Sequence, residues 1–369
     1  MKKILLLGGS GILSSKICDI IVEENEVVIV NRGNHRELCN PKAKLIVADL
    51  KKDTKNEIEK KLENLVFDTV IDFISYTEEE LKKNLSIFAS KTSQYIFISS
   101  ATIYKTQDVN HRYLESDSID NREWKYCIDK RKCEELLKKQ KEVNYTIIRP
   151  YVTYGKTRIP YQIMPLKYYT IIDRILKNKP IPICGMDTKC TITFVDDFAV
   201  GAVGLIGNAK AYGECFHITG VDETTWSEII ETVAVKLDRK VEFVDFSKKF
   251  LKEYEHRGLG VDEILGDKSR NMLFDNSKIK SAVPEFCGNI KFSDKVDEIL
   301  EYYSNEGIKN IDYLWEGCLD WYIKKYSGIK PIKTKSIAIQ DKIKYSIGYH
   351  TVLYYSYKML QKIVKMLRR

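Results

Sequence analysis

The hydrophobic and polar positions of the first 150 residues follow two different periods. Short runs that are apolar throughout predict buried strands, and between them apolar residues recur at helical spacing. The predicted strands cover residues 3–7, 26–30, 44–47, 67–73, 94–98 and 145–148. The predicted helices cover residues 12–23, 55–65, 77–89 and 126–140. Buried strands alternating with helices predict an α/β fold with a doubly wound parallel sheet of the Rossmann type.

The rhythm changes after Pro150. A strand at 192–195, a helix at 198–207 and a strand at 215–218 are predicted to complete the 1–155 domain at about 190–220. Thr225 and Glu228 have the spacing of a capping box and predict a helix that runs to about Leu237. We expect residues 156–189 and 221–329 to form a smaller substrate-binding region.

The positive charge of the chain is concentrated at its end. The formal net charge is +8, but residues 330–369 hold ten Lys and Arg and a single acid, Asp341. The remainder has 50 basic and 51 acidic residues, so the body carries no basic excess. A nucleic-acid partner is therefore not indicated for the body, and any electrostatic argument about partners concerns the tail.

Apolar residues recur near helical spacing within residues 341–369, among lysines and arginines. The tail is therefore predicted to be a basic amphipathic helix. Such a helix lies on an anionic membrane surface, packs its apolar face on the body or a second subunit, or, as the least favoured alternative, contacts nucleic acid. We also expect a homodimer.

The composition places the protein in a reducing compartment. Its nine cysteines include no CxxC pair, and none of its five histidines has metal-ligand spacing, so no metal site is expected. No window reaches about 18 uncharged apolar residues, so no transmembrane helix is expected. We expect a cytoplasmic protein whose membrane association, if any, involves residues 341–369.

A glycine-rich turn follows the first strand. It reads Gly8-Gly9-Ser10-Gly11-Ile12-Leu13 and opens the first helix. Backbone N–H groups and a helix N-terminus at this place bind the pyrophosphate of a dinucleotide, and glycine lets the phosphate approach. The turn therefore predicts a nucleotide site.

The second and third strands carry the candidates for recognition of the adenosine half. An acid after the second strand would accept the ribose 2′-hydroxyl of NAD, but Arg32 stands there and could pair with the 2′-phosphate of NADP. A solvated loop arginine is the alternative. Asp49 either reaches the adenine edge or caps a helix. NADP(H) is therefore slightly favoured over NAD(H).

Tyr126 and Lys130 are four residues apart on a predicted helix and share one face. An ammonium beside a phenol lowers the tyrosine pKa, so the phenol can exchange a proton with a substrate hydroxyl while hydride moves to or from a nicotinamide. Ser100 and Thr102 follow the 94–98 strand, where a sheet of this kind has its ligand crevice.

The order of these motifs, continued by Arg149-Pro150 and Val195-Asp196-Asp197, resembles the extended short-chain dehydrogenase/reductase superfamily. Within it, the chain is similar to the NAD-dependent epimerase/dehydratase family that acts on nucleotide-sugars. The resemblance implies that Ser100 and Tyr126 are catalytic, that Thr102 assists, and that Lys130 holds the nicotinamide ribose.

The resemblance also implies that Tyr151 lines the nicotinamide pocket. Arg158, beyond Tyr154, either contacts a nucleotide diphosphate with that tyrosine or is a surface arginine.

The family resemblance implies hydride transfer at a sugar carbon, C4, by a 4-epimerase or a ketosugar reductase. The Ser-Ala-Thr-Ile-Tyr string at 100–104 is close to that of 4-epimerases, and the Thr-Asp-Glu triplet of 4,6-dehydratases is missing. The Asn-Arg-Gly at 31–33 resembles an atypical subgroup with some RNA-associated members. A non-catalytic dinucleotide-binding regulator or RNA-associated protein is therefore the alternative.

Overall fold

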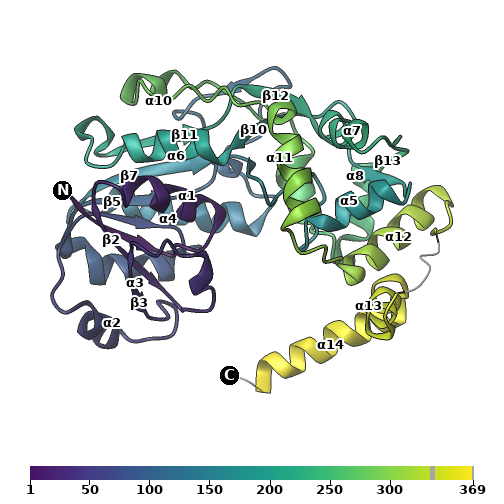
Figure 1. The fold of residues 1–369 in the computed structure, drawn as a ribbon, viewed down its shortest axis with the longest axis horizontal. Helices are drawn as coiled ribbons and strands as arrows, with labels where there is room; N and C mark the ends of the chain where they lie inside the picture. The colour runs from purple at the N-terminus through teal and green to yellow at the C-terminus, as the bar shows by residue number, and fades with distance from the viewer. Residues whose placement is uncertain (333–336, 368–369) are drawn as a thin grey trace. The chain divides into compact units, whose positions relative to one another are not determined.

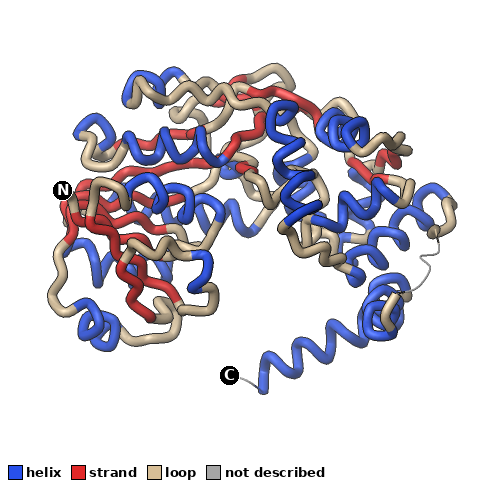
Figure 2. The backbone as a smooth tube through the Cα atoms, viewed as in Figure 1, coloured by secondary structure: helices blue, strands red, loops and turns tan. Residues whose placement is uncertain are grey.

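The computed structural model describes residues 1–332 and 337–367, which fold into two compact units (Figures 1 and 2). Unit 1 comprises residues 1–155, 191–223 and 272–292. Unit 2 comprises residues 156–190, 224–271 and the described part of 293–369.

Unit 1 is built on a seven-stranded sheet in the order β11-β7-β5-β4-β1-β2-β3, in which every neighbouring pair is parallel. Its strands are β1 (Lys3–Leu7), β2 (Glu26–Asn31), β3 (Lys44–Val47), β4 (Phe67–Asp72), β5 (Thr92–Ile98), β7 (Asn144–Pro150) and β11 (Glu214–Ile218). The predicted strands are all present, with boundaries shifted by a few residues.

Helices cover both faces of this sheet, as the apolar strands require. One core contains side chains of α1 (Ile12–Ile21), α6 (Val195–Gly204) and α10 (Ser277–Ala282). The other contains side chains of α2 (Lys55–Leu62), α3 (Glu78–Phe88) and α4 (Lys125–Lys139). The doubly wound Rossmann-type architecture is therefore confirmed.

The helix predicted at 198–207 begins earlier, at Val195, and its preceding strand β10 (Lys189–Phe194) ends there. Asp196 and Asp197 therefore lie within the first turn of α6 and not before it. Negative charges at this position interact favourably with the positive N-terminal end of the helix dipole. Asp197 also accepts a hydrogen bond from the Ile290 amide at 2.9 Å.

Residues 272–292 belong to unit 1, although the sequence pattern groups them with the substrate-binding region. Their strand β14 (Leu273–Phe274) pairs in parallel with β6 (Arg112–Tyr113), and Ile279 of α10 is fully buried in the core. A second short pair joins β10 to β8 (Thr153–Tyr154), and β12 spans Asp222–Thr225.

Unit 2 is mostly helical. It contains α5 (Tyr169–Leu176), β9 (Ile181–Ile183), α7 (Trp226–Lys236), β13 (Phe243–Asp245), α8 (Lys248–Glu253), α9 (Val261–Glu263), α11 (Phe292–Asn305) and α12 (Tyr313–Ser327). The helix α7 begins at the predicted capping box. Arg174 of α5 is buried and donates to Glu316 at 2.9 Å and Asp320 at 2.8 Å, which ties α5 to α12.

The tail contains two helices where the sequence predicted one: α13 (Ile339–Tyr349) and α14 (Thr351–Leu367). The chain is extended at His350, which ends α13. Buried Arg257 donates from Nη2 to the carbonyl oxygens of Gly348 at 3.1 Å and Tyr349 at 3.4 Å, and its charge favours this C-terminus. Arg368 and Arg369 lie outside the described residues.

Helix α13 packs closely on α12 at a pair of glycines. A Cβ on Gly348 would lie 2.1 Å from the carbonyl oxygen of Leu314, and one on Gly317 would lie 2.2 Å from that of Tyr345. The two backbones therefore meet without intervening side chains. Within the described part of the chain, no helix has both the length and the apolar character needed to cross a membrane.

We expect Gly348→Leu to release α13 from α12, because the new side chain has no room at the backbone contact. Overpacking of this kind costs about 1–3 kcal/mol, so amide exchange in residues 339–349 should accelerate about 10-fold or more while the sheet of unit 1 keeps its protection. Lys344→Leu introduces the same side chain at an exposed position of α13 and should change little. Equal exchange in both variants would contradict the proposed close contact.

Candidate functional site

The glycine-rich turn passes close over β2. Gly8 and Gly9 have φ of +113° and +122°, and a Cβ on Gly9 would lie 2.6 Å from Cγ2 of Ile29. The Gly8 amide donates to the carbonyl of Val30 at 3.0 Å. Only glycine fits this path without strain or collision. The turn therefore brings its backbone to the carboxyl edge of the sheet.

Gly11 is the N-cap of α1, and the Ser14 hydroxyl accepts from its amide at 3.1 Å. The first N–H groups of a helix, here those of Ile12 and Leu13, have no acceptor within it. Together with Ser10 they provide a site for an anion at the N-terminus of α1. The turn fits the pyrophosphate predicted from the sequence.

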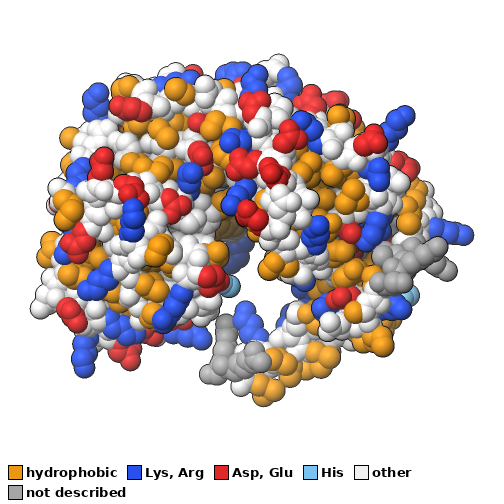
Figure 3. All heavy atoms as spheres, in the orientation of Figure 1, with side chains coloured by type: hydrophobic (Ala, Val, Ile, Leu, Met, Phe, Trp, Pro, Cys, Tyr) orange, Lys and Arg blue, Asp and Glu red, His pale blue; other side chains and the backbone are white. Residues whose placement is uncertain are grey.

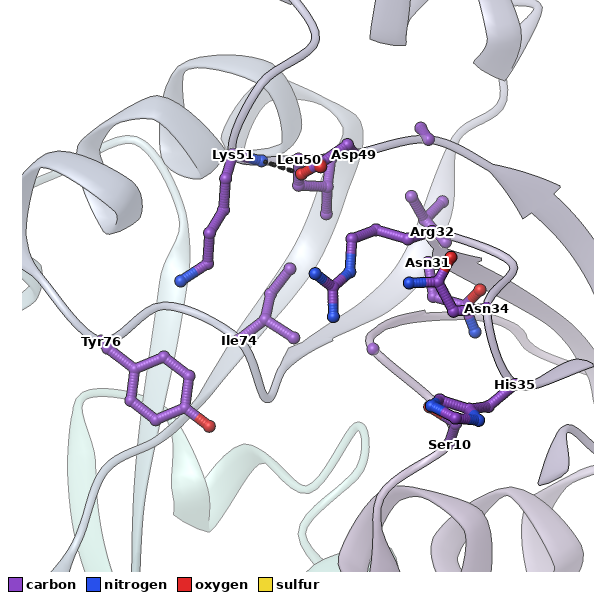
Figure 4. Close-up of a pocket in the computed structure, with 13 residues that line it drawn as sticks. Ser10, Asn31, Arg32, Asn34, His35, Asp49, Leu50, Lys51, Ile74 and Tyr76 are labelled. Carbon is purple, nitrogen blue, oxygen red and sulfur yellow. Dashed lines mark hydrogen bonds between the residues drawn. The ribbon is translucent and has the colours of Figure 1, made fainter. Parts of the chain in front are cut away.

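Beside this turn lies a cavity of about 350 Å³ at the carboxyl ends of β1, β2, β3 and β4 (Figure 4). Gly8 and Ser10 line one side of it and Ile74 and Tyr76 another. The remaining lining residues are Val30, Asn31, Arg32, Asn34, His35, Ala48, Asp49, Leu50 and Lys51. Most of the ionisable groups among them are basic, so the cavity suits an anionic ligand.

The guanidinium of Arg32 extends into the middle of this cavity in Figure 4. Its side chain is exposed, and the described residues include no acid that forms an ion pair with it. Lys51, by contrast, already pairs with Glu80 at 2.7 Å. Of these two cations, Arg32 is therefore the one that is available to form an ion pair with an anionic ligand.

Asp49 lines the same cavity but caps no helix. Its Oδ1 accepts from the Lys51 amide at 3.0 Å, whereas Thr54 is the N-cap of α2 through a capping box with Glu57. The helix-cap interpretation of Asp49 is therefore wrong. Its carboxylate closes the turn after β3, and the adenine contact stays a prediction.

Ser100 and Thr102 lie directly beyond β5. Their hydroxyl oxygens are 2.9 Å apart, and the Ser100 Oγ also accepts from the Thr102 amide at 3.3 Å, in a 3-10 turn over Ala101–Ile103. The Cys127 thiol donates to Thr102 Oγ1 at 3.2 Å and joins this turn to α4. Both candidate hydroxyls therefore stand next to the first turn of the helix that carries Tyr126.

Lys130 is the most constrained of the candidate residues. Its side chain is only 2% exposed, and its Nζ donates to the carbonyls of Ile98, at the end of β5, and Ser75, after β4, both at 2.8 Å. An ammonium has three N–H groups, so one is left for a ligand. Burial lowers the pKa of Lys130 to about 8, and the nearby Asp72 carboxylate partly opposes this shift.

Tyr126 lies on the same face of α4, with the Lys130 Nζ 6.0 Å from its ring centroid. Its half-buried ring contacts Trp124 at 4.7 Å and Tyr76 at 6.2 Å between centroids. The structure therefore brings Ser100, Thr102, Tyr126 and Lys130 together at the carboxyl edge of the sheet.

Tyr76 was not singled out in the sequence. Its ring lies 4.8 Å from the Lys130 Nζ and 5.3 Å from the Lys51 Nζ, so it connects the cavity to the Tyr126 group. A buried network after β4 fixes this loop, with Asp72 accepting from the Ser75 hydroxyl at 2.5 Å and the Tyr95 hydroxyl at 2.6 Å. The sequence feature that could have identified Tyr76 is its position just after the strand predicted at 67–73.

Three further candidates are not among the residues that line this cavity. Tyr151 is buried with its ring 5.1 Å from Phe274, and Tyr154 is buried with its ring 5.3 Å from Phe194. Neither lines the cavity beside the glycine-rich turn. Arg158 belongs to unit 2, where its guanidinium lies 5.5 Å from the Tyr168 ring centroid. The cofactor and substrate roles of these residues stay predictions.

Known proteins resemble the chain in sequence and in fold. Residues 4–218 match the model of the NAD dependent epimerase/dehydratase family. A curated relative, the chloroplast stem-loop binding protein of 41 kDa b of Arabidopsis thaliana, is 28% identical over 253 residues. That match covers 63% of this chain and 62% of the relative, so the chain spans less than two thirds of its length.

Among solved structures, the UDP-glucuronic acid 4-epimerase of Bacillus cereus, in complex with UDP-glucuronic acid and NAD, superposes with a TM-score of 0.63 at 18% identity. This match covers 82% of this chain and 99% of the other. The UDP-glucose 4-epimerase of Thermus thermophilus, in complex with NAD, gives 0.66 at 14% identity, covering 83% and 100%. At these identities the likeness shows the shared fold.

We predict that Lys130 titrates far below an ordinary lysine, whose pKa is near 10.4. Its cation is present below pH 8 and is lost as the pH rises through about 8, because burial disfavours the charged form. In 13C-lysine-labelled protein, one Cε resonance should titrate near pH 8 and disappear in Lys130→Met. A midpoint above pH 10 for that resonance would refute the prediction.

Proposed function

Because the chain belongs to the NAD-dependent epimerase/dehydratase family, we propose that it transfers hydride at C4 of a nucleotide-sugar, as a 4-epimerase or a ketosugar reductase. The observation that carries this proposal is the group of Ser100, Thr102, Tyr126 and Lys130 at one edge of the sheet. Two of the proteins of similar fold are UDP-sugar 4-epimerases, which supports the substrate class.

The residues beside the glycine-rich turn fit a nicotinamide dinucleotide. The close passage of Gly9 over Ile29 and the free first turn of α1 suit the pyrophosphate. Asp49 would face the adenine edge, and Arg32 would pair with a 2′-phosphate, so NADP(H) is slightly favoured over NAD(H). Tyr151 would line the nicotinamide pocket. The dinucleotide, when bound, supplies hydride transfer.

The chain's own groups handle the proton and the orientation of the sugar. Tyr126 would exchange a proton with the sugar hydroxyl, and the Lys130 cation would stabilise its phenolate and bind a ribose with its third N–H. The Ser100 and Thr102 hydroxyls would hold the reacting oxygen. Tyr154 and Arg158 would contact the nucleotide part of the substrate.

The two candidate reactions differ in what happens to the cofactor. An epimerase returns the hydride to the same sugar and keeps its dinucleotide, whereas a reductase must exchange it after each turnover. The Ser-Ala-Thr-Ile-Tyr sequence at 100–104 favours the epimerase, because it is close to that of 4-epimerases. Arg32 favours the reductase, because it suits the 2′-phosphate of NADP(H). Native mass spectrometry of the purified protein would distinguish a retained dinucleotide from a freely exchanged one. We also propose that the protein is cytoplasmic and forms a homodimer, and the mass of the intact complex in the same spectrum would test the dimer.

The alternative is a dinucleotide-binding protein without catalysis that binds RNA or regulates a partner. The observation that favours it is the relative described as a stem-loop binding protein. The presence of Ser100, Tyr126 and Lys130 together counts against it, since a binding module needs none of them.

We expect Tyr126→Phe to lower the turnover of nucleotide-sugars by about 100-fold or more, because it removes the hydroxyl that exchanges the proton. Dinucleotide affinity should be nearly unchanged. Tyr145→Phe makes the same change at the opposite, amino end of β7 and should leave turnover intact. If Tyr126→Phe keeps full activity on every nucleotide-sugar that the wild type converts, the proposed mechanism is wrong.

We expect Arg32→Asp to shift the ratio of NADPH to NADH affinity by about 10-fold or more towards NADH, because a carboxylate repels the 2′-phosphate and accepts a ribose hydroxyl. Fluorescence titration with each reduced cofactor measures the ratio. Arg36→Asp carries the same charge change on an exposed residue outside the cavity and should leave it unaltered. An unchanged ratio in Arg32→Asp would show that this residue does not read the 2′ position.

A further inference from the structure

The last helix of the chain leaves its apolar side chains uncovered. Within α14, Tyr354 is the buried side chain, at 1% exposure, whereas Val352 and Leu367 are 77% and 82% exposed. Figure 3 shows hydrophobic side chains gathered along this helix. The other exposed apolar residues are Leu353, Tyr355, Met359, Leu360, Ile363, Val364 and Met366. So long an exposed apolar surface is unusual for a protein that meets only water.

The apolar and basic residues of α14 lie on different faces. At 100° per residue, Lys358, Lys362 and Lys365 share a narrow polar face, and the exposed apolar residues occupy an arc of about 180° on the other side, interrupted only by Ser356. Tyr354 lies on the polar side, one turn before Lys358, whose Nζ is 5.7 Å from its ring. The helix therefore contacts the rest of unit 2 through its polar side and leaves its apolar face exposed.

The start of α14 is held firmly. Arg257 stacks between Trp321, 4.1 Å away, and Tyr354, 5.0 Å away, while it also caps α13. A Cβ on Gly258 would lie 2.2 Å from the Tyr354 hydroxyl oxygen, so the Tyr354 ring fits here only because residue 258 has no side chain. The first turn is thus fixed and the following turns present their apolar face to a partner.

The charge of the tail identifies what kind of partner fits. After Asp341 the chain has seven Lys and Arg and no acid. Helices that pair with a second copy usually carry complementary charges beside the apolar seam, and α14 offers only positive ones. An anionic surface with an apolar interior matches both faces at once.

A cavity lined by basic and aromatic residues lies at the N-terminus of α14; we call it the hollow. It has a volume of about 440 Å³ and is lined by Trp321, Lys324, Lys325, Tyr349, His350 and Thr351. Tryptophan and tyrosine favour the boundary between headgroups and acyl chains, and two lysines suit a lipid phosphate there. The hollow and the helix therefore indicate the same partner.

We propose that α14 lies in the surface of an anionic lipid bilayer, with its apolar face among the acyl chains and its lysines and the adjoining hollow at the phosphates. The helix has 17 residues, about 25 Å at 1.5 Å per residue, and none of the described helices can span a membrane, so it lies along the surface. This proposal is independent of the hydride transfer proposed above.

Vesicle co-sedimentation of the full-length protein tests the proposal. The wild type should bind vesicles of equal phosphatidylglycerol and phosphatidylcholine, and bind pure phosphatidylcholine at least 10-fold more weakly. Leu360→Glu should reduce binding to the anionic vesicles at least 10-fold, because it puts a charge in the apolar face. Gln361→Glu makes the same change of net charge on the polar face and should reduce binding only about 5-fold, the cost of one unit of charge near such a surface.

A triple variant, Lys358→Gln, Lys362→Gln and Lys365→Gln, should lose about 100-fold in affinity for the anionic vesicles, since each lysine near such a surface adds about 1 kcal/mol. Circular dichroism and the thermal midpoint establish that each variant is folded. Equal binding to both vesicle types, or equal loss in Leu360→Glu and Gln361→Glu, would overturn the proposal. So would the absence of vesicle binding together with a dimer that Leu360→Glu dissociates, because a second copy would then cover the apolar face.

Discussion

The buried ammonium of Lys130 joins three segments that are far apart in the chain. It donates to the carbonyl of Ile98 at the end of β5 and to that of Ser75 beyond β4, and it is itself carried by α4. Removing a cation from water is costly, so the site must keep both carbonyls directed at it. The loop after β4, the end of β5 and α4 are consequently held in one arrangement, and Tyr126, one turn before Lys130, takes its position from it.

A second buried charge supports the same helix from its other end. Glu134 and Arg149 are fully buried and joined by two hydrogen bonds, one of them at 2.9 Å and the other at 2.6 Å, and Arg149 also donates to the Tyr104 hydroxyl at 2.9 Å. The Arg149 charge holds the pKa of the Glu134 carboxyl below its usual range despite burial. Loss of either partner would leave an unpaired buried charge, which is far more damaging than loss of a surface ion pair.

The two helices of the tail, α13 and α14, are similar in sequence character but differ in how they pack. Helices α13 and α14 are both basic and amphipathic, yet α13 is packed on α12 through Gly317 and Gly348, whereas α14 has Tyr354 as its one buried side chain. Backbone contact needs a residue without a side chain at the crossing, and α14 contains no glycine. The close packing of α13 on α12 therefore depends on Gly348 and Gly317, and α14 has no glycine that could make such a contact.

The sequence by itself determined the Rossmann-type sheet, the glycine-rich turn and the pairing of Tyr126 with Lys130, because each depends on local periodicity or on spacing within one element. Tertiary structure decided the rest. Cys127 joins Thr102 to α4, Tyr76 lies over Lys130, and the 272–292 segment returns to the first unit through contacts between distant parts of the chain. Arg257, 91 positions earlier in the chain, binds the carbonyl of Gly348 where α13 ends, and the periodicity of residues 341–369 does not reveal this contact. Local patterns specify elements, but which elements meet depends on packing and on the satisfaction of buried polar groups.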